Sequence, residues 1–182
     1  MLCEAHALQL TKVVLCTAMP FHLPDSLGRH RTFNNAQIAC GVEVIEGHYI
    51  FSDDIKGYTE KQSDINVALS LITDGIDNIY DWAILVSADS DQAATARVFR
   101  ERFSDKNLAV IAPPNRKPPE KAIPYCDLHF SISKDQIEDA LLPEYVKSLS
   151  GGFIRRPKEY DPPAGWLAPS HRPKRKRSAK PS

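Results

Sequence analysis

The stretch 81–91, DWAILVSADSD, decides the fold class of this chain. Residues 82–86 form the least polar run in the sequence. A short, continuous apolar run is typical of a central strand that is covered on both faces. Polar residues follow at once, and the segment up to residue 103 reads as a helix. The stretch therefore predicts a buried strand that carries acidic side chains at its carboxyl end.

Strand-like and helix-like segments alternate on both sides of this stretch. Within the 60–76 segment, the spacing of one apolar helix face is followed by Ile65, Ala68, Leu69 and Ile72. Residues 20–29 and 52–59 read as loops. The expected strands are 12–19, 42–51, 81–87, 107–112 and 128–133, and the expected helices are 32–40, 60–76, 91–103 and 134–142. This alternation predicts an α/β fold with three layers, in which helices cover both faces of a mainly parallel sheet.

The charge is distributed unevenly along the 182 residues, although the net charge is zero. Residues 169–182 hold six basic side chains and no acidic one. We therefore predict a folded domain at residues 1–150 and a Pro-rich, basic, flexible tail at 151–182. Such a tail is either an arm that binds nucleic acid or a solubilising end. The tail residues that we expect to contact RNA are Arg172, Lys174, Arg175, Lys176 and Arg177.

Several classes of protein are excluded by composition. No stretch reaches the roughly 18–20 apolar residues that cross a bilayer, and the first ten residues lack the basic region of a signal peptide. We therefore expect no membrane association. The four cysteines contain no C-x-x-C pair, which argues against a disulfide scaffold or a zinc ribbon. This usage predicts a cytoplasmic protein.

Acidic side chains gather around the end of the central strand. Asp89 and Asp91 follow it directly, and carboxylates this close repel each other unless a cation such as Mg²⁺ or Mn²⁺ lies between them. Asp64 lies in the first turn of the preceding helix. Helix capping by Asp91 and a favourable interaction of Asp64 with the helix dipole are the alternative explanations. Lys61 is either a phosphate contact or a surface charge.

Other motifs with acidic or nucleophilic residues do not match. An EF-hand counted from Asp89 would need Gly at its sixth position and Glu at its twelfth, where the chain has Ala94 and Arg100. The sequence contains no G-x-x-x-x-G-K phosphate loop and no G-x-S-x-G nucleophile. The aspartates therefore remain as the candidate functional residues.

The segments 61–69, KQSDINVAL, and 80–91, YDWAILVSADSD, together resemble the NYN domain, a PIN-like nuclease family that includes LabA-like proteins. The family pattern is K-x-x-D on a helix, followed by a strand that ends in S-x-D-x-D. The resemblance covers most of residues 10–160. It implies a PIN-like fold and metal-dependent ribonuclease chemistry that acts on RNA. It further implies that Asp64, Asp89 and Asp91 bind Mg²⁺ or Mn²⁺ and that Lys61 and Ser87 make supporting contacts.

The chain departs from the family pattern in one respect. NYN domains open with a strand that ends in D-G-x-N and supplies a further metal ligand, and no D-G-x-N occurs in residues 1–20. Without a central parallel strand, sheet edges and apolar surface would be exposed. We therefore expect marginal stability or a homodimer.

Three functions remain open at this stage. The first is a metal-dependent endoribonuclease that uses Asp64, Asp89 and Asp91. The second is a catalytically impaired module that binds RNA or regulates it. The third is a different small-molecule enzyme on the same fold, because fold does not determine function.

Overall fold

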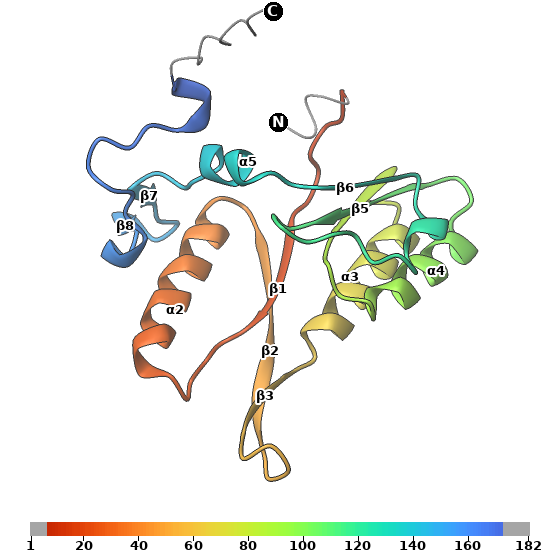
Figure 1. The fold of residues 1–182 in the computed structure, drawn as a ribbon, viewed down its shortest axis with the longest axis horizontal. Coiled ribbons are helices and arrows are strands. Elements are labelled where there is room, and N and C mark those ends of the chain that lie inside the picture. Colours follow the sequence, from red (N-terminus) through yellow and green to blue (C-terminus); the bar gives the residue numbers. More distant parts are fainter. Residues whose placement is uncertain (1–6, 173–182) are drawn as a thin grey trace, which may run out of the picture.

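The computed structural model describes residues 7–172 (Figure 1). Its strands are β1 (Val14–Ala18), β2 (Glu43–Ser52), β3 (Gly57–Lys61), β4 (Trp82–Val86), β5 (Asn107–Ala112), β6 (Leu128–Ser131), β7 (Tyr145–Lys147) and β8 (Phe153–Arg155). Its α-helices are α2 (Pro24–Ala39), α3 (Ser63–Ile76), α4 (Gln92–Arg102) and α5 (Lys134–Asp139). Short 3₁₀ helices lie at Ile123–Tyr125, Lys158–Tyr160 and Pro169–His171.

The described strands form separate sheets rather than one continuous sheet. One sheet has the order β1-β2-β3 and another has the order β4-β5-β6, while β7 and β8 pair with each other. The pairs β1–β2, β4–β5 and β5–β6 are parallel, and β2–β3 is antiparallel. The predicted α/β class is therefore confirmed. The expected single, mainly parallel sheet is not, because the described strands fall into separate sheets in which β1 and β4 each pair on one side within residues 7–172.

Helices lie on both sides of β1 and β2, with α2 on one side and α3 on the other (Figure 1). The sheet β4-β5-β6 is covered on one face by α4, whose Ala96 and Phe99 pack in the same cluster as Leu108 and Val110. On its other face, Ile84 and neighbouring side chains border a small cavity of about 130 Å³.

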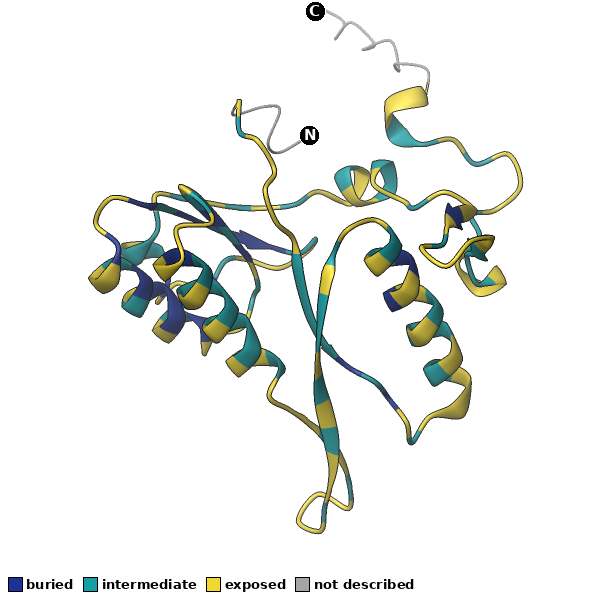
Figure 2. Ribbon diagram, turned by 180° about the vertical axis from the view of Figure 1, so that it is seen from behind, coloured by how far each residue is buried: buried dark blue, intermediate teal, exposed yellow. Residues whose placement is uncertain are grey.

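The hydrophobic core lies almost entirely in the β4-β5-β6 half of the molecule. Buried residues concentrate in β4, α4 and β5, whereas the β2–β3 hairpin is mostly exposed (Figure 2). Phe99 and Leu108 are fully buried, while Ala18 and Ala36 are small residues that bury little area in the other half. Since apolar burial is the main source of stability, the half that contains β1 and β2 depends on its contacts with α3.

The turn between α3 and β4 is held by buried polar contacts. The Tyr80 hydroxyl donates a hydrogen bond to the Leu71 carbonyl at 2.5 Å, and burial raises the pKa of Tyr80 to about 12. The buried Lys106 donates to the Tyr80 carbonyl at 2.8 Å and to the Asn78 side chain. The Tyr80 hydroxyl and the Lys106 ammonium group therefore both have partners. These contacts hold the turn that leads from α3 into β4.

The predicted loops at 20–29 and 52–59 were wrong in part. Helix α2 already begins at Pro24, because proline is tolerated in the first turn, where its missing N–H needs no partner. Residues 57–61 form β3, which pairs with β2 in a long antiparallel hairpin that projects from the body (Figure 1). This hairpin also moves the start of the 60–76 helix to Ser63.

The predicted apolar face of α3 is confirmed only in part. Ile72 packs against the core together with Val67 and Leu71, whereas Ile65 and Leu69 are 60% and 59% exposed. The helix carries apolar residues on two faces, so spacing alone did not indicate which face is buried.

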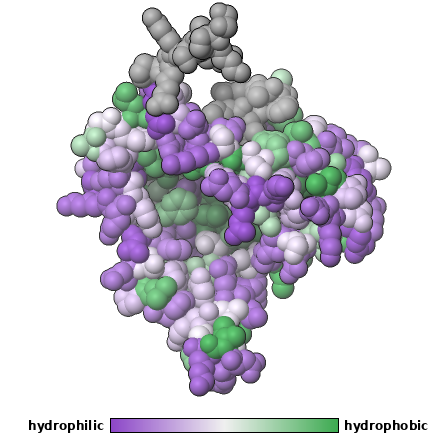
Figure 3. Space-filling view, in the orientation of Figure 1, coloured by the Kyte–Doolittle hydropathy of each residue, from purple (hydrophilic) through white to green (hydrophobic). Residues whose placement is uncertain are grey.

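The predicted domain boundary at residue 150 lies within the β7–β8 hairpin. Tyr145 pairs with Arg155 and Lys147 with Phe153, and both strands contact α2. Between α2 and residues 137–160 lies a cavity of about 720 Å³. Figure 3, in the orientation of Figure 1, shows a hollow with apolar residues near the middle of the view. Further apolar side chains lie on the projecting β2–β3 hairpin. Residues 151–172 therefore pack with the domain.

Within residues 7–172, no helix is both long enough and apolar enough to cross a membrane.

Gly47 is the point at which β2 changes partners. It is the last residue of β2 that pairs with β1, opposite Ala18, and the next residue, His48, pairs with β3. A Cβ at Gly47 would lie 2.5 Å from the Lys61 carbonyl oxygen and 2.8 Å from the Ser63 hydroxyl. The close approach of two backbones therefore requires glycine here.

We predict that Gly47→Ala lowers the free energy of unfolding by roughly 1–3 kcal/mol, because the added methyl must displace the Lys61 backbone. Gly28→Ala is the matched control, since its Cβ would meet nothing within 4 Å. Gly28→Ala should raise the free energy of unfolding by about 0.5–1 kcal/mol, because alanine favours the helix. Urea denaturation followed by circular dichroism measures both, and equal effects of the two changes would contradict this role of Gly47.

Candidate functional site

The loop between β4 and α4 carries three of the predicted site residues, Ser87, Asp89 and Asp91. The Ser87 amide bonds to the Ile111 carbonyl and extends the pairing of β4 with β5. The Ser87 hydroxyl accepts a hydrogen bond from the Asp89 amide at 3.0 Å, and the Asp89 carboxylate accepts one from the Asp91 amide at 2.9 Å. The side chains of Ser87 and Asp89 therefore shape the loop itself.

Asp91 occupies the N-cap position of α4, but its side chain makes no capping hydrogen bond. Simple capping therefore does not account for its carboxylate. Asp89 and Asp91 are both exposed, next to the helix end where unpaired amides favour negative charge.

Asp64 is brought to this loop by Gln92, the first residue of α4. The Gln92 amide nitrogen donates to a carboxylate oxygen of Asp64 at 3.2 Å and lies 3.3 Å from the Asp64 carbonyl oxygen. Because Gln92 directly follows Asp91, this contact places the acid of α3 at the same helix end as Asp89 and Asp91.

The orientation of the Gln92 amide follows from its partners. Both oxygens of Asp64 can only accept, so the amide nitrogen must face them. The Gln92 side-chain oxygen then accepts a hydrogen bond from the Thr95 hydroxyl at 2.9 Å. Gln92 is only 3% exposed, so this orientation is fixed by a buried network.

Asp74, on the same helix as Asp64, does not belong to this group. Ten residues along an α-helix correspond to about 15 Å of axial rise. Asp74 instead accepts from Lys12 at 2.8 Å, and this ion pair raises the pKa of Lys12.

Lys61 ends β3 two residues before α3 and is exposed. The tight connection to α3 passes through Gln62, whose φ of 76° lies in the left-handed region. The Ser63 hydroxyl donates to Glu60, and Gln62 contacts His48 at 3.1 Å. These contacts fix the start of α3, and therefore the position of Asp64.

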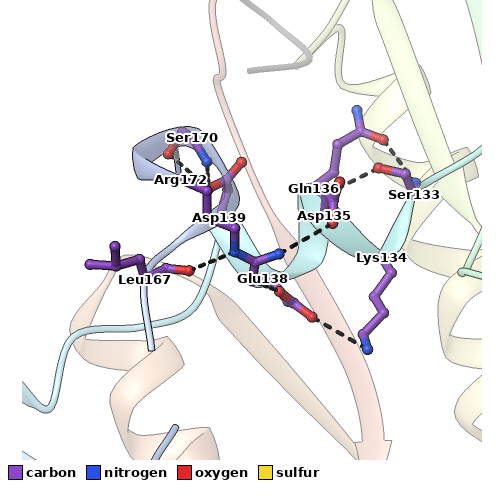
Figure 4. A network of polar contacts seen from close by, with 9 residues as sticks. All are labelled: Ser133, Lys134, Asp135, Gln136, Glu138, Asp139, Leu167, Ser170 and Arg172. Carbon is purple, nitrogen blue, oxygen red and sulfur yellow. Dashed lines mark hydrogen bonds and ion pairs between the residues drawn. The ribbon is translucent and has the colours of Figure 1, made fainter. Parts of the chain in front are cut away.

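Arg172, the one predicted tail contact among the described residues, lies away from these aspartates. Figure 4 shows Arg172 beside α5, where it pairs with Glu138 at 2.5 Å and donates to the Leu167 carbonyl at 3.0 Å. Ser170 bonds to Asp139 of the same helix. Arg172 is thus engaged with an acidic helix in this structure. Lys174, Arg175, Lys176 and Arg177 lie outside the described residues.

The donor chemistry of the three aspartates fits Mg²⁺ or Mn²⁺, which prefer hard oxygen ligands. The Gln92 contact brings Asp64 to the N-terminal end of α4, where Asp89 and Asp91 lie. However, residues 7–172 contain no group of three His, Cys, Asp or Glu side chains that could hold a metal ion. The predicted metal site therefore remains a prediction.

Sequence reasoning missed Gln92, although a signal for it exists. Gln92, Ala96, Phe99 and Phe103 share one helix face, and the last three are buried core residues. A polar residue on such a face must find a buried partner. The partner itself lies 28 residues earlier, on another helix.

No family model, no curated protein and no solved structure matches this chain.

We predict that Gln92→Glu lowers the free energy of unfolding by about 1–3 kcal/mol at pH 7, because it sets a second carboxylate against Asp64. The loss should shrink as the pH falls and a carboxyl becomes protonated, which removes the repulsion. Urea denaturation as a function of pH measures this effect.

The double variant Gln92→Glu/Asp64→Asn is the control, since it restores a neutral partner. Its stability should recover toward that of the wild type. A Gln92→Glu protein as stable as wild type at pH 7 would show that the two side chains do not meet.

Proposed function

We propose that this chain is a metal-dependent endoribonuclease, in which Asp64, Asp89 and Asp91 bind Mg²⁺ or Mn²⁺. The observation that carries the proposal is the Gln92–Asp64 hydrogen bond at 3.2 Å, which joins the acid of α3 to the loop that carries the other two. A bound cation would polarise a phosphoryl oxygen and lower the pKa of an attacking water.

The positions of the other residues agree with this role. The carboxyl ends of strands are where open α/β sheets bind ligands, and the loop after β4 lies at such an end. Lys61, three residues before Asp64, would contact a phosphate, and Ser87 would hold the Asp89 loop. The complete arrangement that we propose is the three-layer PIN-like fold, and the cytoplasm is its proposed location.

The proposal predicts cleavage of a 5′-labelled single-stranded RNA with Mn²⁺ or Mg²⁺ and none with EDTA. Asp89→Asn should slow cleavage by more than roughly 100-fold, because even outer-shell partners of a metal cost about 10–100-fold. Asp105→Asn, at an exposed turn before β5, is the matched control and should cleave at the wild-type rate.

Cleavage that resists EDTA, or equal rates for Asp89→Asn and wild type, would contradict the proposal. Binding of the RNA without cleavage would instead identify a non-catalytic RNA-binding module. That second candidate is favoured by the lack of a three-ligand metal group within residues 7–172.

We infer in addition that the chain associates as a homodimer through α3. Ile65, Leu69 and Ile76 on this helix are 60%, 59% and 70% exposed. An exposed apolar stripe of this kind marks a protein–protein contact more often than a free surface.

A further inference from the structure

The cavity of about 720 Å³ beside α2 lies apart from the candidate metal site. Its wall comes from α2, from residues 137–143, from the β7–β8 hairpin and from residues 157 and 160. None of the three aspartates of the candidate site lines it. Its volume falls within the range of about 300–1,000 Å³ that is typical of small-molecule sites.

Most of the cavity wall is apolar. Helix α2 contributes Phe33 and Ala36, α5 and the loop after it contribute Ile137 and Leu141, and β8 contributes Ile154. Phe33, Ile137 and Leu141 are 44%, 50% and 40% exposed. An apolar occupant would remove these side chains from water, which favours binding.

The charged residues of the wall are arginines. They are Arg29, Arg155 and Arg156, and neither Asp nor Glu lines the cavity. Arg155 and Arg156 donate to the Asp161 carboxylate at 2.7 Å and 3.1 Å, and Arg155 also pairs with Glu144 at 3.1 Å. Carboxylates outside the wall therefore balance much of the charge of these two arginines.

Arg29 is the arginine of the wall whose charge is least balanced. Within residues 7–172 its one carboxylate partner is Glu159, at 4.0 Å, and its guanidinium donates to the Ser26 hydroxyl at 3.3 Å. A guanidinium has five N–H donors in a fork that matches a carboxylate. Arg29 can therefore bind an anion in the cavity without losing a close ion pair.

We propose that this cavity binds one small amphipathic anion, with its carboxylate on Arg29 and its apolar body against the side chains of α2 and α5. The inference does not depend on the proposed nuclease function. A nucleotide fits this wall less well, because the apolar side chains would leave polar groups of its sugar and base without hydrogen bonds. Residues 173–182 hold five basic side chains and no acidic one, so the arginines of the wall would repel that segment.

Sodium decanoate is the probe, and calorimetric titration of the 182-residue chain measures its binding. We expect one molecule to bind per chain. Decan-1-ol has the same apolar body without the charge and should bind about tenfold or more weakly, because hydrogen bonds to a charged group are the stronger ones. Sodium acetate, which keeps only the carboxylate, should not bind. Sodium 2-naphthoate distinguishes a ring from a chain as the apolar body.

Two arginines of α2 provide a matched pair of variants. Arg29→Gln removes the charge at the cavity, so it should weaken decanoate binding about tenfold or more and leave decan-1-ol binding unchanged. Arg31→Gln removes the same charge at an exposed position that does not line the cavity, and it should bind decanoate as the wild type does.

A second pair of variants tests the position of the apolar body. Ala140→Trp fills the cavity from the end of α5 and should abolish the binding of both decanoate and decan-1-ol. Ala94→Trp adds the same side chain at an exposed position of α4, away from the cavity, and should leave both unchanged.

Equal binding of decanoate and decan-1-ol, equal affinities of Arg29→Gln and Arg31→Gln, or no binding of either acid would overturn the proposal. Binding of several decanoate molecules per chain would also overturn it, because that result indicates adsorption of a surfactant. Displacement of decanoate by the peptide PKRKRSAKPS would show instead that residues 173–182 occupy the cavity, which contradicts the proposal.

Discussion

The packing of α3 against both sheets is the constraint on which the rest of this structure depends. On one side α3 contacts β1 and β2, and on the other it contacts α4, which covers the β4-β5-β6 sheet. The polar contacts that bridge the halves also involve α3, through Asp74 with Lys12 and Asp64 with Gln92. Because β1 and β4 share no backbone pairing, contacts of α3 hold the two sheets in relation to each other.

This constraint connects the candidate site to the half of the molecule that contains β1. Asp64 lies in the first turn of α3 and contacts Gln92, directly after the acidic loop, while Asp74 lies in the last turn of the same helix beside the start of β1.

The sequence predicted the parts of the structure that depend on local pattern. The apolar run of β4 and its acidic end were predicted because burial on two faces leaves few polar residues. The start of α2 at Pro24 and the pairing of β3 were missed, because proline has two meanings near a helix start and hairpin register depends on the partner strand. The Gln92–Asp64 contact joins residues far apart in the chain, and no local pattern encodes it. The separation of the described strands into different sheets was not predicted, because the alternation of strands and helices indicates that a sheet forms and not how many.

Native-state hydrogen exchange along β1 and β4 tests the central claim most directly. If the edges of β1 and β4 that turn away from β2 and β5 are unpaired, the Trp82 and Ile84 amides should exchange roughly 100-fold or more faster than those of Ala83 and Leu85, which bond to β5. The Val14 and Cys16 amides of β1 should likewise exchange faster than their neighbour Leu15. Uniform slow exchange along both strands in the isolated protein would show that the edges are already paired and would contradict the account.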